Sequence, residues 1–328
     1  MSERAPIRPA AARGPVPRLR LAVLALALGA VAIGAAAPIA RAVQAPPAAA
    51  AATTPPNATT PPAADAAAVA TEAAPSAAHA PETHAPSFAT EYLKPATADY
   101  DLYYEQLRRQ HFLESVAQEL DRILELPAQL TLRLDECGHS TTQRSRDGRV
   151  VIVCYEYVDA VLVIAAGAAP SEARAEQLFS GGVTFALLSE IGQALIGLLE
   201  LPVAAGPARG GDQFAAIALA AAEKDGDPSA AAAVEFLEIA LREPDSGFEY
   251  LETHEFGRAR LEDVACLLYG NAPGNHAATR ASGALPQSRA PRCAEELVAT
   301  VRAWNGYLAK YTRPAVTAGA APAAGGSR

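Results

Sequence analysis

The residues with the most recognisable chemistry lie in a strongly apolar stretch, 183–199, that is predicted to form a helix. It carries Ser189, Glu190 and Gln193 at the spacing of an H-E-x-x-H motif. In that motif two histidines at i and i+4 share one helix face and bind Zn²⁺, while the glutamate polarises the metal-bound water. Here the two ligand positions hold a hydroxyl and an amide, which are poor zinc ligands. We therefore expect no metal or other cofactor here, and Glu190 keeps a base position without a metal-bound water.

A second His-Glu pair, His254-Glu255, has Arg258 where the second histidine of such a motif would stand. A guanidinium stays protonated and has no lone pair for a metal ion, so we expect no metal-binding role for His254. A non-standard site that recruits Asp212 or His254 is the alternative. The chain gives no support to hydrolase-elbow or nucleotide-binding classes, because it lacks G-x-S-x-G, P-loop and G-x-G-x-x-G motifs at strand–helix junctions.

These residues must be positioned by a small sheet and many helices. Apolar residues recur every three or four positions over 99–126, which predicts one amphipathic helix ending near Pro127. Residues 129–134 alternate and 149–154 form a β-branched run, so we expect two strands joined as a hairpin by Asp147-Gly148. Further helices are predicted after Cys154, over 172–179 with Ser171 as cap, 183–199, 212–224 with Asp212 as cap, 229–241, 261–269 and 294–311. This content predicts an α+β fold with one globular domain.

The ends of the chain differ in composition from its middle. Residues 1–42 combine an arginine-rich start, an apolar run over 21–40 and an A-x-A site, which predicts a signal peptide or an N-terminal membrane anchor. Residues 43–86 are rich in Ala and Pro and are predicted to be a disordered spacer, and 314–328 a disordered tail. The globular domain is therefore expected over 87–313, outside the cytoplasm: periplasmic, secreted or held at the inner membrane.

Four cysteines, Cys137, Cys154, Cys266 and Cys293, all fall within the expected domain. An even count in an exported chain predicts two disulfides, for which three connectivities are possible. Pairing of neighbours closes the shortest loops and would place Cys137–Cys154 across the expected hairpin, so we predict this pairing. The absence of C-x-x-C argues against a cysteine zinc site.

The net charge of the chain is −9, although its N-terminal segment is basic. Binding to nucleic acid or to anionic lipid depends on neutralising phosphates with basic residues. We therefore expect neither partner, and membrane contact only through the N-terminal segment.

Further fragments extend the pattern around the 183–199 helix. Downstream come Leu201-Pro202 and Asp212-Gln213-Phe214-Ala215. The remaining fragments are Leu126-Pro127, Glu136-Cys137-Gly138, Cys154-Tyr155-Glu156, Cys266–Gly270, Leu285-Pro286, Arg289-Ala290 and Cys293. Over most of residues 110–310, the order and spacing of these fragments resemble those of a bacterial putative metallopeptidase family of exported, zincin-like proteins. Members of that family carry H-E-x-G-H, then L-P, then an acidic stretch ending in D-Q-x-A.

The resemblance implies a zincin-like fold, zinc in the relatives, and a cleft for which Asp212 and Gln213 are lining candidates. It also implies an acidic third ligand just before Asp212, but 206–211 contains no acid and one basic residue, Arg209. The family's N-A-x-Y is replaced here by 141–144, Thr-Thr-Gln-Arg. We therefore expect a catalytically impaired homologue that binds a peptide or protein partner. An active peptidase with a non-standard metal site and a structural envelope protein without ligand are the alternatives.

Overall fold

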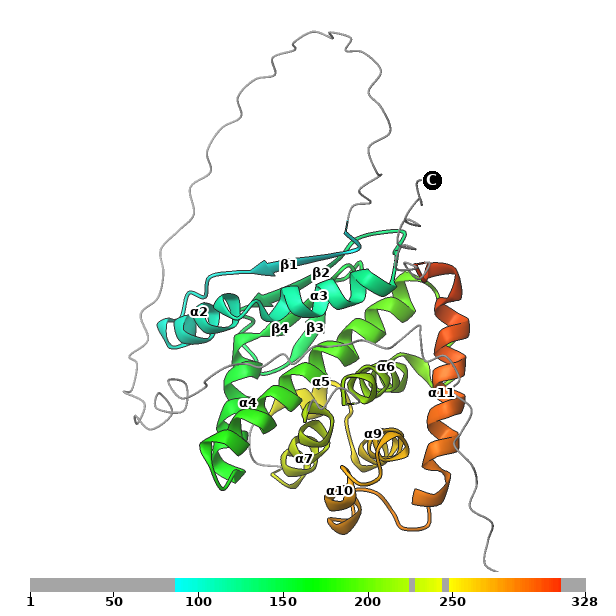
Figure 1. The fold of residues 1–328 in the computed structure, drawn as a ribbon. Helices are drawn as coiled ribbons and strands as arrows, with labels where there is room; N and C mark the ends of the chain where they lie inside the picture. The colour runs from blue at the N-terminus through cyan, green and yellow to red at the C-terminus, as the bar shows by residue number, and fades with distance from the viewer. Residues whose placement is uncertain (1–85, 224–227, 244–247, 314–328) are drawn as a thin grey trace, which may run out of the picture.

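The computed structural model describes residues 86–223, 228–243 and 248–313 (Figure 1). These residues form one α+β domain, in which a small mixed sheet is followed by a mostly helical remainder, as predicted. The zincin likeness stays a prediction. The expected signal peptide or anchor, the spacer and the tail lie outside the described residues.

The sheet contains four strands in the order β1-β2-β4-β3. They are β1 (Phe88–Tyr92), β2 (Leu130–Asp135), β3 (Thr142–Arg144) and β4 (Val150–Cys154). The predicted hairpin of β2 with β4 is wrong, because these two strands pair in parallel. The chain between them supplies β3, which pairs antiparallel with β4 and leaves the turn at Asp147-Gly148 inside this shorter hairpin. Gly148 adopts φ 69°, a conformation that favours glycine.

The first predicted helix is divided in two. Helices α2 (Asp101–Arg109) and α3 (Phe112–Ile123) are separated by His111, whose φ of 53° interrupts the helical path. Figure 1 shows α3 lying along the sheet, where it packs against β1 and β2. After β4 the chain enters α4 (Tyr155–Ala168), as the helical pattern beyond Cys154 predicts.

The centre of the domain is α5 (Glu172–Leu198), one continuous helix where two were predicted. Ser171 caps it, with the Arg174 amide donating to Ser171 Oγ at 3.3 Å. The interval between the two predicted helices contains Gly181 and Gly182. Because they have no side chains, α7 (Ser229–Arg242) can approach α5 closely at this point. A Cβ on Gly181 would lie 2.5 Å from the Ala233 nitrogen. Although α5 is long and apolar enough to span a membrane, 89% of its most apolar window is buried inside the domain, as in a core helix.

The remaining helices surround α5. They are α6 (Gly206–Glu223), α7 (Ser229–Arg242), α8 (Glu249–Thr253), α9 (Arg258–Asn271), α10 (Ala277–Ala281) and α11 (Cys293–Leu308), with 3₁₀ turns η1 (Ala98–Tyr100), η2 (Ala290–Arg292) and η3 (Ala309–Tyr311). Helices α6 and α7 pack on α5, and α9 packs between α6 and α11. Asp212 is not a helix cap as predicted, because α6 already begins at Gly206 and Asp212 lies within it.

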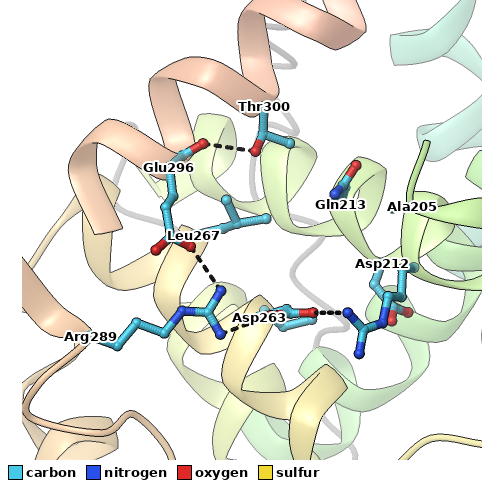
Figure 2. A pocket seen from close by; sticks show the side chains of 10 residues that line it. Ala205, Asp212, Gln213, Asp263, Leu267, Arg289, Glu296 and Thr300 are labelled. Atoms are coloured by element: carbon cyan, nitrogen blue, oxygen red, sulfur yellow. Dashed lines mark hydrogen bonds and ion pairs between the residues drawn. The ribbon is translucent and has the colours of Figure 1, made fainter. Parts of the chain in front are cut away.

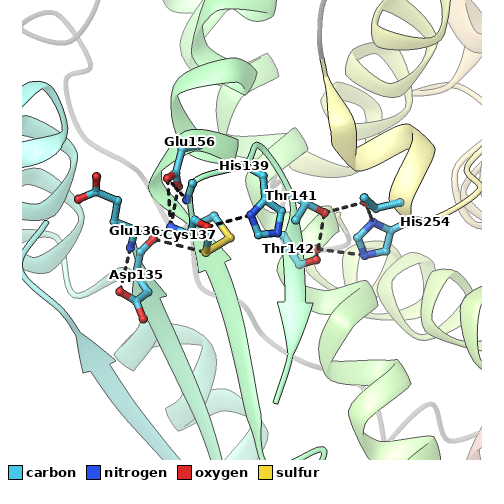
Figure 3. Close-up of a disulfide and its surroundings, with 11 residues drawn as sticks. Asp135, Glu136, Cys137, His139, Thr141, Thr142, Glu156 and His254 are labelled. Atoms are coloured by element: carbon cyan, nitrogen blue, oxygen red, sulfur yellow. Dashed lines mark hydrogen bonds between the residues drawn. A yellow bond between two sulfur atoms is a disulfide. The ribbon is translucent and has the colours of Figure 1, made fainter. Parts of the chain in front are cut away.

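Both predicted disulfides are present, Cys137–Cys154 and Cys266–Cys293. The first joins the segment after β2 to the last residue of β4, two parallel neighbours, and the second joins α9 to the start of α11. Beside the first, the Glu156 carboxylate accepts hydrogen bonds from the Cys137 amide at 3.0 and 3.1 Å (Figure 3). Disulfides of this kind are typical of an oxidising compartment outside the cytoplasm.

Helices α5 and α6 come unusually close at two glycines, Gly192 and Gly211. A Cβ on Gly211 would lie 2.4 Å from the Ser189 carbonyl oxygen and 2.6 Å from Gln193 Cγ. A Cβ on Gly192 would lie 2.7 Å from Phe214 Cβ. The absence of side chains at these two positions therefore lets α6 press directly on the part of α5 that carries Ser189 and Gln193.

We expect Gly211→Ala to lower the free energy of unfolding by about 1–3 kcal/mol, because the added methyl overlaps the α5 backbone. The matched control is Gly197→Ala, in α5, where a Cβ would meet no atom within 4 Å. This control should be neutral or stabilise by about 0.5–1 kcal/mol, since alanine favours helix over glycine. Urea denaturation measures both, and equal effects would contradict the close helix contact.

Candidate functional site

Glu190 lies in the middle of α5 with its side chain only 1% exposed, at the floor of a pocket of about 420 Å³. Its Oε2 forms an ion pair with Nη1 of Arg144, which comes from β3. Its Oε1 lies 2.5 Å from Nε2 of His254, the residue that follows α8, and 3.3 Å from Nε2 of Gln193. Both oxygens of this carboxylate are therefore engaged by side chains of the protein.

His254 contacts an acceptor with each ring nitrogen. Nε2 faces Glu190, and Nδ1 lies 3.0 Å from the Tyr250 carbonyl oxygen. The Tyr250 ring stacks on the imidazole with the centroids 4.4 Å apart. Figure 3 shows His254 facing Thr142, whose Oγ1 is 3.4 Å from Nε2. These contacts fix the ring in place against Glu190.

The surroundings of Glu190 stabilise its ionised form. Burial by itself raises the pKa of this carboxyl, but the hydrogen bond from His254 and the charge of Arg144 hold the pKa below its ordinary value. A general base is most effective when its pKa lies near the working pH. Glu190 is instead a carboxylate that already pairs with the Arg144 guanidinium and contacts His254 Nε2, which makes it a poor proton acceptor.

Ser189, at the first ligand position of the motif, is fully buried and donates to Asp212 Oδ1 at 3.0 Å. Asp212 in turn forms a bidentate ion pair with Arg260, in which Nε lies 2.6 Å from Oδ2 and Nη2 lies 2.8 Å from Oδ1. Burial raises the pKa of Asp212 despite these hydrogen bonds. Gln193, at the second position, borders the pocket beside Glu190.

Asp212 and Gln213 border a different cavity, of about 120 Å³, between α6, α9 and α11. Figure 2 shows the chain of ion pairs along it, formed by Arg209, Asp263, Arg289 and Glu296. Gln213 accepts a hydrogen bond from Trp304 Nε1 at 3.4 Å. The structure therefore brings the Asp212 carboxylate to Ser189, while Gln213 contacts Trp304 and does not line the pocket beside Glu190.

The side chains present at α5 do not fit a zinc ion. A hydroxyl and an amide stand at the ligand positions, and the carboxylate nearest to Ser189 is occupied by a buried guanidinium. Among the residues that the structure describes, one group of three possible ligands is found, Cys137, Cys154 and Glu156. It is no metal site either, because the two sulfurs form a disulfide.

The pocket beside Glu190 is walled by the edge strand β3. The other lining residues are His139, Thr141, Gln193, Ala208, Thr253, His254 and Glu255. At the two ends of the β3–β4 pairing, the Ser145 amide donates to the Val150 carbonyl oxygen at 2.9 Å and the Cys154 amide donates to the Thr141 carbonyl oxygen at 3.4 Å. By the alternation of an antiparallel ladder, the backbone groups of the intervening Thr142 and Arg144 point away from β4. This edge of β3 is paired with no strand among the described residues.

Sequence reasoning located Glu190, Ser189 and Gln193 but missed the cationic partners of the buried acids. Arg144 could have been noticed, because it stands in the segment where this chain departs from the N-A-x-Y of the family it resembles. His254 and Arg260 carry no local signal: they lie 64 and 48 residues from the carboxylates that they contact. Only the packing of α8 and α9 on α5 and α6 brings them there.

A comparison with protein families shows that a family model described as a putative metallopeptidase matches residues 92–308. No curated protein and no solved structure matches the chain.

We expect Glu190→Gln to lower the free energy of unfolding at pH 7 by about 3 kcal/mol, because it leaves Arg144 and His254 without their anionic partner. The folded-state pKa of Glu190 lies below the ordinary 4.5. The stabilisation by the carboxylate is therefore fully present above about pH 4.5 and is lost as the pH falls through the folded value.

The check is urea denaturation of both proteins from neutral pH down to pH values at which the carboxylate protonates. The difference between wild type and variant should shrink on acidification. Glu105→Gln, at an exposed position in α2, is the control and should show a small difference at every pH. A pH-independent difference for Glu190→Gln would contradict the ion-pair assignment.

Proposed function

This chain belongs to the putative metallopeptidase family, and on that premise we propose that it is a non-hydrolytic member that binds an extended peptide segment in the pocket beside Glu190. The observation that carries the first half of the proposal is the engagement of both Glu190 oxygens by Arg144 and His254. Peptide hydrolysis by a metal-assisted route needs a metal-activated water and a free base. Ser189 and Gln193 supply no ligand set for the former, and Glu190 is not available as the latter.

The second half of the proposal, peptide binding, rests on the shape of the pocket and on its wall. An extended peptide can add to an unpaired strand edge through main-chain hydrogen bonds, with affinity from the backbone and specificity from neighbouring side-chain pockets. Arg144, which is exposed, offers such an edge through its outward backbone groups, whereas Thr142 is buried and its carbonyl oxygen already accepts from Thr141 Oγ1 at 3.1 Å. A second pocket of about 510 Å³ shares Ala208, His254 and Glu255 with the first, so a ligand can extend from one into the other.

The alternative of an active peptidase with a non-standard metal site is disfavoured by the same contacts. His254 donates to Glu190, and Asp212 is bound by Arg260. Recruiting either residue to a metal would require breaking a buried ion pair, which is strongly destabilising. A structural envelope protein without ligand remains the outcome to which a failure of peptide binding would point.

The proposed setting is outside the cytoplasm, in the periplasm, in the secreted fraction or at the inner membrane. The two disulfides support an oxidising compartment, and the expected N-terminal segment supplies the route of export. The zincin-like fold of the relatives is likewise proposed for this domain.

The test uses the immobilised full-length protein and a random-sequence peptide library, with and without added Zn²⁺. We expect a subset of peptides to be retained and recovered uncleaved under both conditions, as measured by mass spectrometry. Ala208→Trp should abolish retention, because its indole would fill the region shared by the two pockets.

The control for that variant is Ala204→Trp, an exposed position in the preceding turn that borders neither pocket, and it should retain the same peptides as wild type. Retention that survives Ala208→Trp would place binding elsewhere. Absence of retention by the wild type would reject peptide binding, and zinc-dependent cleavage would reject the non-hydrolytic assignment.

A further inference from the structure

Two carboxylates are buried side by side in the centre of this domain, and each requires a compensating positive charge. The side chains of Glu190 and Asp212 are 1% and 3% exposed. Transfer of an unpaired ionised carboxylate into such surroundings is prohibitively costly. In a helix that binds zinc through two histidines, the metal ion brings positive charge to this region. Here three side chains contact the two carboxylates: the guanidinium groups of Arg144 and Arg260 bring the positive charge, and His254 contacts Glu190.

Arg260 is the most enclosed of the three, with 7% of its side chain exposed. Its guanidinium binds both oxygens of Asp212, at 2.6 and 2.8 Å, and lies over the Phe256 ring at 4.8 Å. It also donates to the His254 carbonyl oxygen and, at 3.4 Å, to the Ala208 carbonyl oxygen. One cation therefore ties together the start of α6, the segment between α8 and α9, and α9 itself.

The same cation lies next to the position of the absent first histidine. Asp212 Oδ1 accepts both from Ser189 Oγ at 3.0 Å and from Arg260 Nη2 at 2.8 Å. Arg260 is thus separated from Ser189 by a single carboxylate oxygen. A divalent ion bound at this helix would face the fixed positive charge of the guanidinium, and Asp212 already accepts three hydrogen bonds, from Ser189 Oγ and from Arg260 Nε and Nη2.

We propose that Arg260 is an internal replacement for a metal ion: its guanidinium supplies the positive charge at the 189–193 part of α5 and prevents zinc from binding there. Arg144 plays the corresponding part at Glu190. The assignment goes beyond peptide binding and does not depend on it. It implies that the fold needs no metal, and that restoring two histidines is insufficient to restore a zinc site.

The test compares variants of the full-length protein, dialysed against Zn²⁺ and then analysed for bound metal and for thermal unfolding. The double variant Ser189→His with Gln193→His should fold and hold no stoichiometric zinc. Adding Arg260→Gln should produce about one zinc per chain and a zinc-dependent rise in Tm, because Asp212 is released as a third ligand. Arg260→Gln by itself should lower Tm, and zinc should not restore it.

The matched control adds Arg258→Gln to the double variant instead. Arg258 is exposed, borders the neighbouring pocket and makes no contact with Asp212, so this protein should stay zinc-free. Stoichiometric zinc in the double variant, or in the Arg258 control, would overturn the proposal. A triple variant with Arg260→Gln that holds no zinc would overturn it as well. The same holds if that triple variant fails to fold in the presence of zinc while the double variant folds.

Discussion

The arrangement of this domain depends on one costly feature, a carboxylate buried within the longest helix of its core. A glutamate in the centre of an apolar helix is stable only if charged and hydrogen-bonding partners reach it from elsewhere. For Glu190 these partners come from β3 and from the end of α8, 46 and 64 residues away. The edge of the sheet and the C-terminal half of the chain are thereby held against the same point of α5. The pocket lies where these three elements meet.

Local sequence patterns predicted the elements well where each element is stabilised by its own residues. The alternation of 129–134, the β-branched run of 149–154 and the serine cap of α5 all correspond to observed structure. The predictions were wrong where contacts between residues far apart in the sequence determine the structure. The two recognised strands are parallel neighbours, because a third, short strand takes the hairpin position, and three polar-rich residues give almost no strand signal. Similarly, two helices were predicted over 172–179 and 183–199, but the structure has one, in which Gly181 and Gly182 allow the close packing of α7.

In the candidate site, too, local spacing predicted the residues on one helix but not their partners from distant parts of the chain. Spacing alone located Ser189, Glu190 and Gln193 on one helix, and the structure places Glu190 and Gln193 beside a pocket. Which cations neutralise the acids could not be read from spacing. His254 was considered for its own His-Glu pair, whereas its actual partner is Glu190. The neighbouring Arg258 drew attention in that motif, yet the buried arginine is Arg260, whose environment exists only once α9 has packed.

The disulfide Cys137–Cys154 has a consequence for one wall of the pocket beside Glu190. The chain leaves Cys137 and runs through His139, whose Nδ1 lies 2.9 Å from the Cys137 carbonyl oxygen, directly into Thr141 and β3. This short segment forms one wall of the pocket beside Glu190, and the disulfide attaches its first residue, Cys137, covalently to the end of β4. While both thiols are reduced, this segment is held in place only through hydrogen bonds and packing. Formation of the disulfide, which an oxidising compartment favours, therefore ties this wall of the pocket covalently to the end of β4.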